Sequence, residues 1–238
     1  MHNFKVDLVF NAFNEIESIE KDLNLIFSLS SQNELVDKIF VIEDGSTDGT
    51  SEKLRELSEV YNLNLSQSRQ RRGYANALIK GLSISNSEYI FFSDLGGKFD
   101  WDEINSLINK IPENDLVIGV RKHRNDQKYR RLLTHLYSKY ILLFYGINSN
   151  DPDSGFRIYK RSLINKIMKN ELINKHLLNS ELTIKCISEN CNYAEVPIKY
   201  FQRKGPSRGM PISIIPNVII STIKNSFRIK KQINEYSE

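Results

Sequence analysis

The sequence predicts an α/β protein with a mostly parallel sheet that helices cover on both faces. Short apolar runs, typical of buried strands, alternate with stretches in which apolar residues recur at helical spacing. Acidic residues follow several of these runs, at the strand ends where open α/β sheets bind ligands. The 238 residues suffice for one such domain with a full core, alone or with a small extension.

The elements follow one another in regular order. Strands are predicted at residues 6–10, 39–42, 63–66, 89–92 and 115–119, and a later one at 194–201. The helices between them show apolar positions at Ile16, Ile19, Leu23, Ile26 and Phe27, at Leu54, Leu57, Val60 and Tyr61, and at Ile104, Leu107, Ile108 and Ile111. Another helix is predicted from about Arg72, and its small residues favour close packing on the sheet.

Composition and charge narrow the class of protein. Hydrophobic residues make up 40% and charged residues 26%, as in ordinary globular proteins. The net charge of +4 is unevenly distributed, with basic clusters at 69–72, 121–131, 199–208 and 224–231. Such clusters are solvated faces, or they meet an anionic ligand or membrane surface. Without a recognised motif they do not predict nucleic acid as a partner. Cys186 and Cys191 lack zinc-site spacing and are expected as free thiols.

The location is predicted from two absences in the sequence. The first residues lack a basic region followed by a long apolar run, so no signal peptide is expected. No stretch has the roughly 18 consecutive apolar residues of a spanning helix. We therefore expect a cytoplasmic protein, and peripheral contact with the inner face of the membrane stays open.

Carboxylates are predicted to gather at one edge of the sheet. Glu15 follows the first strand, Glu43 and Asp44 end the second, and Asp94 ends the fourth. Because parallel strands bring their carboxyl ends to one edge, these acids suggest a site for a sugar, a nucleotide or a metal. The alternative is that Asp44 only shapes a turn and that the residues after it only cap a helix.

The motifs along the chain resemble one enzyme family. NAFNE (11–15), VIEDGSTDGT (41–50), RRGYANALIKGL (71–82) and FFSDLGGKFDWDEI (91–104) resemble, in order, the signatures of family 2 glycosyltransferases. VIGVR (117–121), NDPDSGFRIYKRSLI (150–164) and YAEVPIKYFQRKGPSR (193–208) resemble the subgroup of dolichol- and polyprenyl-phosphate hexosyltransferases. The resemblance implies a GT-A, Rossmann-like domain over residues 1–208, followed at 209–238 by an amphipathic, basic helical extension.

The resemblance also implies which residues hold the donor, a nucleotide-diphosphate sugar. The residues it places on the nucleotide sugar are Phe13, Glu15, Asp44, Ser46, Arg72, Gly73 and Arg121. Asn11 stands where the family usually has proline, and Ala75 replaces a frequent glycine.

The metal-binding DXD motif of the family is incomplete in this sequence. Asp94 aligns with its first aspartate, as a metal ligand and catalytic residue, and Gly96 replaces the second. We therefore expect Mg²⁺ or Mn²⁺ to be weakly held, and Gly96→Asp to tighten Mn²⁺ binding. Three interpretations stay open, in this order: a metal held by Asp94 and the donor's phosphates, cationic side chains in place of the metal, or lost transferase activity.

The acceptor side is also implied by the resemblance. Asp151 lies in a segment that the family places beside the sugar and the acceptor, and Glu181 aligns with a helical acid that faces the acceptor. Both are catalytic candidates, although Asp151 also fits a turn before a strand and Glu181 a helix surface. The basic loop suggests an acceptor-phosphate site, against the alternative of a solvated loop, at Arg203, Ser207 and Arg208.

Two apolar stretches complete the prediction. Residues 212–223 are rich in isoleucine and precede a basic segment, which fits an interfacial amphipathic helix, and residues 132–145 add a second apolar surface. Alternatively, these stretches pack on each other, on the domain, or in a homo-oligomer.

The function predicted from all of this is hexose transfer. We expect an inverting glycosyltransferase that moves a hexose from a nucleotide-diphosphate sugar to a polyprenyl (dolichyl-type) phosphate. The alternatives are a transferase that acts on a sugar hydroxyl of a surface polysaccharide, and a non-catalytic nucleotide-sugar-binding relative.

Overall fold

A computed structural model describes residues 4–122, 128–201 and 212–236. Within these residues one seven-stranded sheet has the strand order β3-β2-β1-β4-β6-β5-β7. The strands are β1 (Val6–Ala12), β2 (Val36–Glu43), β3 (Asn64–Gln67), β4 (Tyr89–Asp94), β5 (Leu116–Lys122), β6 (Arg157–Lys160) and β7 (Tyr193–Lys199). Their pairing is parallel except at β6, which is antiparallel to both of its neighbours, β4 and β5. The prediction of a mostly parallel sheet is confirmed.

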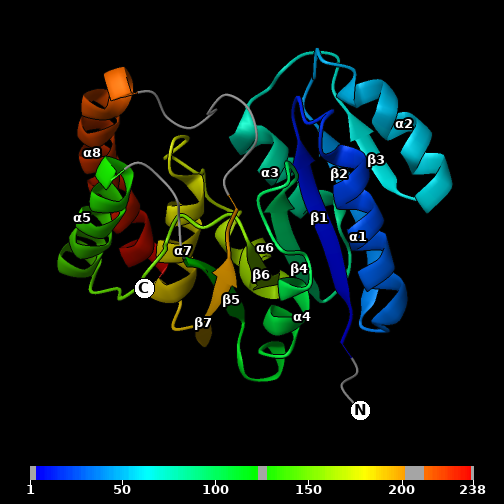
Figure 1. The fold of residues 1–238 in the computed structure, drawn as a ribbon. Coiled ribbons are helices and arrows are strands. Elements are labelled where there is room, and N and C mark those ends of the chain that lie inside the picture. Colours follow the sequence, from blue (N-terminus) through cyan, green and yellow to red (C-terminus); the bar gives the residue numbers. More distant parts are fainter. Residues whose placement is uncertain (1–3, 123–127, 202–211, 237–238) are drawn as a thin grey trace.

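Helices cover both faces of this sheet, as predicted (Figure 1). They are α1 (Ile19–Gln32), α2 (Thr50–Tyr61), α3 (Tyr74–Ile84), α4 (Glu103–Ile108), α5 (Lys128–Tyr145), α6 (Arg161–Ile167), α7 (Leu178–Ser188) and α8 (Ile215–Tyr236), with short 3₁₀ turns at Ile111–Glu113 and Ile212–Ile214. One core cluster joins the sheet to α1, α2 and α4, and a second joins it to α3, α6 and α7. In α3, Gly81 lies against β1, because a Cβ there would come within 2.6 Å of Val9 Cγ1. That contact confirms the predicted close packing.

Several element boundaries differ from the prediction. α1 begins only at Ile19, and Ile16 is left partly exposed in the preceding loop. Val60, expected on the apolar face of α2, is 69% exposed in the last turn of that helix. β6 is absent from the predicted order, because four residues after a turn show no periodicity of their own. Its insertion separates β4 from β5 and places the segment 151–157 beside the end of β4.

α5 and α8 pack against each other at the side of the sheet (Figure 1). The rings of Phe144 and Phe227 meet edge to face with their centroids 5.2 Å apart. Ile141 of α5 and Ile229 of α8 share a buried cluster with Ile184 of α7. The predicted C-terminal helix is therefore present and packs on the domain. In the part of the chain that the structure describes, no helix is long and apolar enough to cross a membrane.

Candidate active site

Backbone N–H groups hold the loops that follow β1 and β2. The Asn14 N–H donates to Ser46 Oγ at 2.9 Å, and the Glu15 N–H donates to Thr50 Oγ1 at 2.8 Å. Asn14 itself has φ 54°, a left-handed conformation that asparagine tolerates better than most residues. The predicted turn residues of both strands therefore come together at the carboxyl edge of the sheet.

Asp44 joins this edge to the loop that precedes α3. Its two carboxylate oxygens accept the backbone N–H groups of Arg72 and Gly73 at 2.8 and 2.9 Å. The Arg71 guanidinium lies over the Phe13 ring, 4.2 Å from the ring centroid. The structure thus brings together six of the predicted donor residues, namely Phe13, Glu15, Asp44, Ser46, Arg72 and Gly73. Asp44 also has the turn-shaping role that the sequence left open.

The turn after β4 explains the glycine in the incomplete DXD motif. Gly96 has φ 126°, and a Cβ there would lie 2.8–3.0 Å from the carboxylate of Glu15. The N–H groups of Gly96 and Gly97 both donate to Asp22 at 2.8 Å. The structure therefore argues against the expectation that Gly96→Asp would tighten Mn²⁺ binding, which stays a prediction. A side chain at position 96 would be strained and would displace Glu15.

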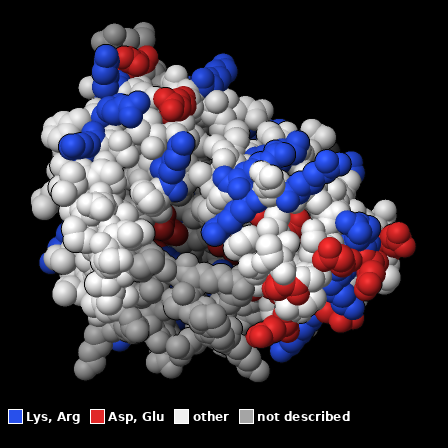
Figure 2. Space-filling model, turned by 90° about the horizontal axis from the view of Figure 1, so that it is seen from above, with Lys and Arg blue, Asp and Glu red and all other residues white. Residues whose placement is uncertain are grey.

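A polar cavity of about 180 Å³ opens beside the end of β4. Its lining combines charged, aromatic and amide side chains from β4, β5, α3, α7 and the segment before β6, among them Tyr74, Asp94, Lys98, Arg121, Asp153, Gly155, His176, Asn179 and Tyr200. We call it the polar pocket. Seen from above the sheet, Figure 2 shows acidic side chains within a hollow and basic side chains near its rim.

Asp94 is the predicted metal ligand in the polar pocket. Burial raises the pKa of its carboxyl, and Lys98 and Arg121 oppose this rise. The Lys98 ammonium lies 3.9 Å from Oδ2, whereas Oδ1 is buried and has no hydrogen-bond partner. Among the described residues no group of three or more His, Cys, Asp and Glu side chains could hold a metal ion. The donor set therefore fits only a cation that a ligand's own oxygens help to coordinate.

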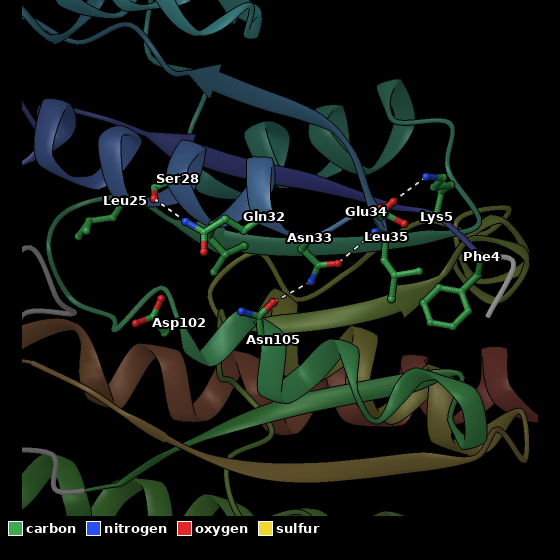
Figure 3. Close-up of a pocket in the computed structure, with 11 residues that line it drawn as sticks. Phe4, Lys5, Leu25, Ser28, Gln32, Asn33, Glu34, Leu35, Asp102 and Asn105 are labelled. Atoms are coloured by element: carbon green, nitrogen blue, oxygen red, sulfur yellow. Dashed lines mark hydrogen bonds between the residues drawn. The ribbon is translucent and has the colours of Figure 1, made fainter. Parts of the chain in front are cut away.

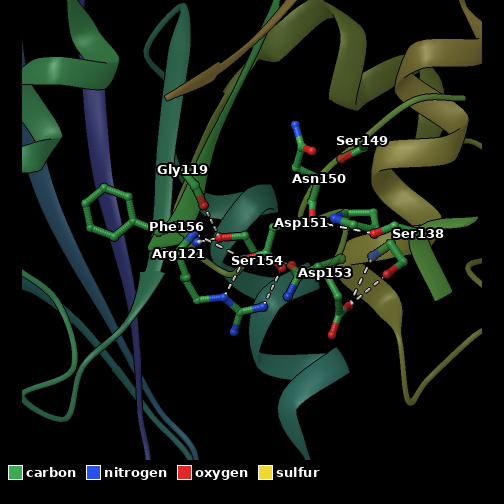
Figure 4. Close-up of polar contacts among 12 residues, drawn as sticks. Gly119, Arg121, Ser138, Ser149, Asn150, Asp151, Asp153, Ser154 and Phe156 are labelled. Atoms are coloured by element: carbon green, nitrogen blue, oxygen red, sulfur yellow. Dashed lines mark hydrogen bonds and ion pairs between the residues drawn. The ribbon is translucent and has the colours of Figure 1, made fainter. Parts of the chain in front are cut away.

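Arg121 is held in a fixed orientation by Asp151 (Figure 4). Its Nε and Nη2 donate to the two carboxylate oxygens of Asp151 at 2.7 and 2.6 Å, the bidentate geometry that suits arginine and carboxylate. Asp151 is almost completely buried. Its geometry makes it an orienting partner of Arg121, and the catalytic role implied for it stays a prediction.

A buried arginine organises the segment between Asp151 and β6. Arg157 is fully buried, and its guanidinium donates to the carbonyl oxygens of Pro152, Ser154 and Asn179. The same segment carries Asp153, whose carboxylate accepts the backbone N–H of Ser180 at 3.2 Å. Burial raises the pKa of Asp153 to about 6 against the opposing effect of Arg121 and Arg157. The sequence analysis did not predict a role for Asp153, although it lies two residues after the catalytic candidate Asp151.

Glu181 has a structural environment apart from the polar pocket. It is fully buried in α7, where it pairs with Lys185 at 2.7 Å and accepts the backbone N–H groups of Ile173 and Asn174. It lines neither the polar pocket nor the apolar groove described next. Its implied role as a base is therefore left without a contact to the site.

An apolar groove lies between α5 and α8. It measures about 390 Å³ and is lined by apolar and aromatic side chains, chiefly Leu133, Leu136, Tyr137, Tyr140, Ile215, Val218, Ile219 and Ile223. We call it the apolar groove. Arg121 and Asp153 line both this groove and the polar pocket. The two spaces therefore meet at a pair of opposite charges.

A larger hollow at the opposite edge of the sheet differs in character (Figure 3). It measures about 730 Å³ and lies between the end of α1, the start of β1 and α4. Its side chains are largely occupied with one another, as where Asn33 Nδ2 donates to Asn105 Oδ1 at 2.7 Å. Size alone does not identify a site, and this hollow lacks the converging charges of the polar pocket.

Three predicted residues cannot be placed. Arg203, Ser207 and Arg208 lie outside the described residues. Conversely, sequence reasoning missed Lys98, Tyr74 and Asn179, which line the polar pocket. Lys98 and Tyr74 lie within the family motifs at 91–104 and 71–82. Their spacing in these motifs does not distinguish them from neighbouring residues that do not line the pocket.

The fold and the site together define a class of protein. Acid-bearing loops at the carboxyl edge of a mostly parallel sheet, beside a polar pocket, are typical of an α/β enzyme that binds a nucleotide-linked substrate. The family model described as "Glycosyl transferase family 2" matches residues 8–168. The chain belongs to this family, and the resemblance predicted from the motifs is confirmed.

Relatives and solved structures agree with this assignment. The chain is similar to a dolichyl-phosphate beta-glucosyltransferase of Saccharomyces cerevisiae, with 26% identity over 203 residues that cover 75% of this chain and 61% of the relative. It therefore spans about three fifths of that relative's length. Mannosyl-3-phosphoglycerate synthase from Rubrobacter xylanophilus has a TM-score of 0.70 at 14% identity, with 96% of this chain and 75% of that chain covered. Glucosyl-3-phosphoglycerate synthase from Mycobacterium tuberculosis, in complex with Mn²⁺ and UDP, has a TM-score of 0.66 at 18% identity, with 93% and 80% covered. These neighbours confirm the GT-A fold.

Proposed function

We propose that this protein transfers a hexose from a nucleotide-diphosphate sugar to a polyprenyl phosphate, with inversion at the anomeric carbon. The observation that carries the proposal is the meeting of the polar pocket and the apolar groove at Arg121 and Asp153. A polyprenyl phosphate has the same two parts, a long apolar chain and an anionic head. The chain would lie between α5 and α8, and the phosphate would lie beside Arg121. The name of the yeast relative is consistent with such an acceptor.

The donor would lie across the carboxyl edge of the sheet. Its nucleotide would meet the loops after β1 and β2, which Asp44 joins to the start of α3. Its sugar would enter the polar pocket, next to Asp94. A structure of the mycobacterial neighbour contains UDP-glucose, which makes that donor the first to test.

The reaction needs no strong base under this proposal. A phosphate oxygen of the acceptor, already ionised at neutral pH, attacks the anomeric carbon while the bond to the nucleoside diphosphate breaks. The products are a hexosyl phosphate lipid and the free nucleoside diphosphate. Arg121, fixed by Asp151, would hold the attacking phosphate, so positioning and charge stabilisation would provide most of the catalysis.

A divalent cation would have one protein ligand in this site. Asp94 would hold Mg²⁺ or Mn²⁺ through its carboxylate, and such an ion would neutralise charge on the leaving diphosphate. Lys98 already places a positive charge 3.9 Å from Oδ2 of Asp94. Because this ammonium competes for the same carboxylate, we propose that the cation is weakly held.

The apolar side chains outside the groove suggest how a membrane-bound acceptor is reached. Leu132 and Leu143 of α5 and Ile220 and Phe227 of α8 are each more than half exposed. Exposed apolar side chains with basic residues nearby on α8 suit the surface of an anionic bilayer. We propose peripheral contact there, on the same side of the molecule as the apolar groove.

The test compares two leucines on one helix. Leu136 lines the apolar groove, whereas Leu143 is 86% exposed and does not. With a short, water-soluble polyprenyl phosphate and UDP-glucose, Leu136→Asp should lower kcat/KM for the acceptor by roughly 10-fold or more, since a carboxylate would enter an apolar site. Leu143→Asp should leave it near the parental value. Equal rates for both variants, or transfer to a glycan hydroxyl only, would refute the lipid-phosphate acceptor.

A further inference from the structure

Asn179, at the start of α7, has an unsatisfied amide in the polar pocket. Its side chain is 5% exposed, and Nδ2 donates to Tyr74 Oη at 2.7 Å. Its Oδ1 is buried without a hydrogen-bond partner. Turning the amide over would not remove the deficit, because the NH₂ group would then lose its partner. A buried polar atom without a partner is costly, and in a residue that lines a pocket it points to a group supplied by a ligand.

The space in front of this amide is kept open by Gly155. A Cβ built on Gly155 would lie 3.5 Å from both Asp94 Oδ2 and Tyr74 Oη, and 3.8 Å from Asn179 Nδ2. These are ordinary contact distances, so alanine would fit without a clash. Its methyl group would nevertheless fill the space on which the three polar groups converge.

The chemistry around Asn179 favours a hydroxyl. Asn179 offers an amide, and Tyr74, to which it donates, is a phenol at neutral pH. Arg121 and Asp153 line both the polar pocket and the apolar groove. An anionic phosphate suits Arg121, where the two spaces meet. A sugar ring, rich in hydroxyl groups, suits the amide of Asn179 and the phenol of Tyr74.

We propose that Asn179, oriented by Tyr74 and given space by Gly155, recognises a hydroxyl of the transferred sugar and determines which hexose is accepted. This inference rests on the proposed function, since it names the sugar subsite of the same pocket. A site built to bond a hydroxyl discriminates strongly against an analogue that lacks it, because the site's own polar atom is then left unpaired.

The test measures the contribution of the sugar to binding, without any acceptor. The donor is whichever of UDP-glucose, UDP-galactose, GDP-mannose and dTDP-glucose binds the parent most tightly, and the reference ligand is its free nucleoside diphosphate. Calorimetry on the parent, Asn179→Ala and Gly155→Ala gives the ratio of the two affinities for each protein. Asn109→Ala, at an exposed position after α4, is the matched control. Thermal unfolding checks that each variant is folded.

We expect the donor to bind the parent at least 10-fold more tightly than its diphosphate, and both pocket variants to lose most of this ratio. Affinity for the diphosphate should stay within about two-fold in all proteins, as should both affinities in the control. An unchanged ratio in either folded variant, or no sugar-dependent gain in the parent, would overturn the inference. Because no acceptor is present, failure of the lipid-phosphate proposal would appear only in the transfer assay and would leave this result unaffected.

Discussion

Two regions at the carboxyl edge of the sheet place their charges differently. At β1, β2 and the turn after β4, carboxylates accept backbone N–H groups, as Asp44 does from Arg72 and Gly73 and as Asp22 does from Gly96 and Gly97. Around β5 and β6, charged side chains lie close together, and Arg121 pairs directly with Asp151. Asp94 and Asn179, which line the polar pocket beside Arg121 and Asp153, each keep a buried atom without a partner.

The difference suggests a division of labour. Carboxylates bonded to backbone N–H groups fix the loops that would hold a nucleotide, and they act mainly through structure. The region around β5 and β6 borders the polar pocket and contains a carboxyl whose pKa burial raises, a feature that clusters at reactive sites. Substitutions in the two regions should therefore affect stability and function differently.

The largest effect is expected at Arg157. Arg157→Met keeps much of the side-chain volume but removes the donors for the carbonyl oxygens of Pro152, Ser154 and Asn179. We expect a loss of about 3 kcal/mol in the free energy of unfolding, measured by urea denaturation. Arg157→Lys should recover only part of this loss, because lysine keeps the charge without the planar fork. Full stability in Arg157→Met would show that the segment does not depend on this buried charge.

Much of the first region could be predicted from the sequence. Apolar runs followed by turn residues predicted β1, β2 and β4. Because these strands are parallel, the acids that follow them were also predicted to lie at one edge of the sheet. The second region was harder to predict, because β6 is short and lies in the sheet between β4 and β5, both of which are distant from it in sequence. Residues such as Asp153 and Asn179 acquire their roles only from that insertion, which sets them beside Asp94.

A smaller loss of stability is expected for a substitution of Gly96, in the first region. Gly96→Ala places a methyl group within 3.0 Å of the Glu15 carboxylate in a backbone with φ 126°. We expect it to destabilise the fold by about 2 kcal/mol in the same denaturation assay. Gly97→Ala is the control: Gly97 also has a positive φ, of 63°, and its N–H also donates to Asp22, but a Cβ there would meet only Ser18 Cβ, at 3.5 Å. Equal losses for the two variants would mean that the space taken by Glu15 is not what requires glycine at position 96.

Asp153 offers the most specific test of the second region. Its pKa is raised to about 6 in the folded protein, mainly by burial, from an ordinary value near 3.8. Between these values the folded state holds a proton that the unfolded state has released, so stability should fall as the pH rises from about 4 to about 6. We expect a loss of about 1 to 3 kcal/mol, since the shift is about two pKa units and one unit corresponds to about 1.4 kcal/mol.

The measurement is the difference in unfolding free energy between the parent and Asp153→Asn across this pH range. Asparagine stays neutral at every pH, so the difference (parent minus variant) should fall as the pH rises if the pKa of Asp153 is raised in the folded state. Above about pH 6 the difference should level off, because the carboxyl is then ionised in both states of the parent. A difference that rises with pH would mean that the pKa of Asp153 is lowered in the folded state. Arg121 and Arg157 would then lower this pKa by more than burial raises it. The region around β5 and β6 would then be a satisfied ionic network like its neighbour, and the contrast between the two regions would no longer hold.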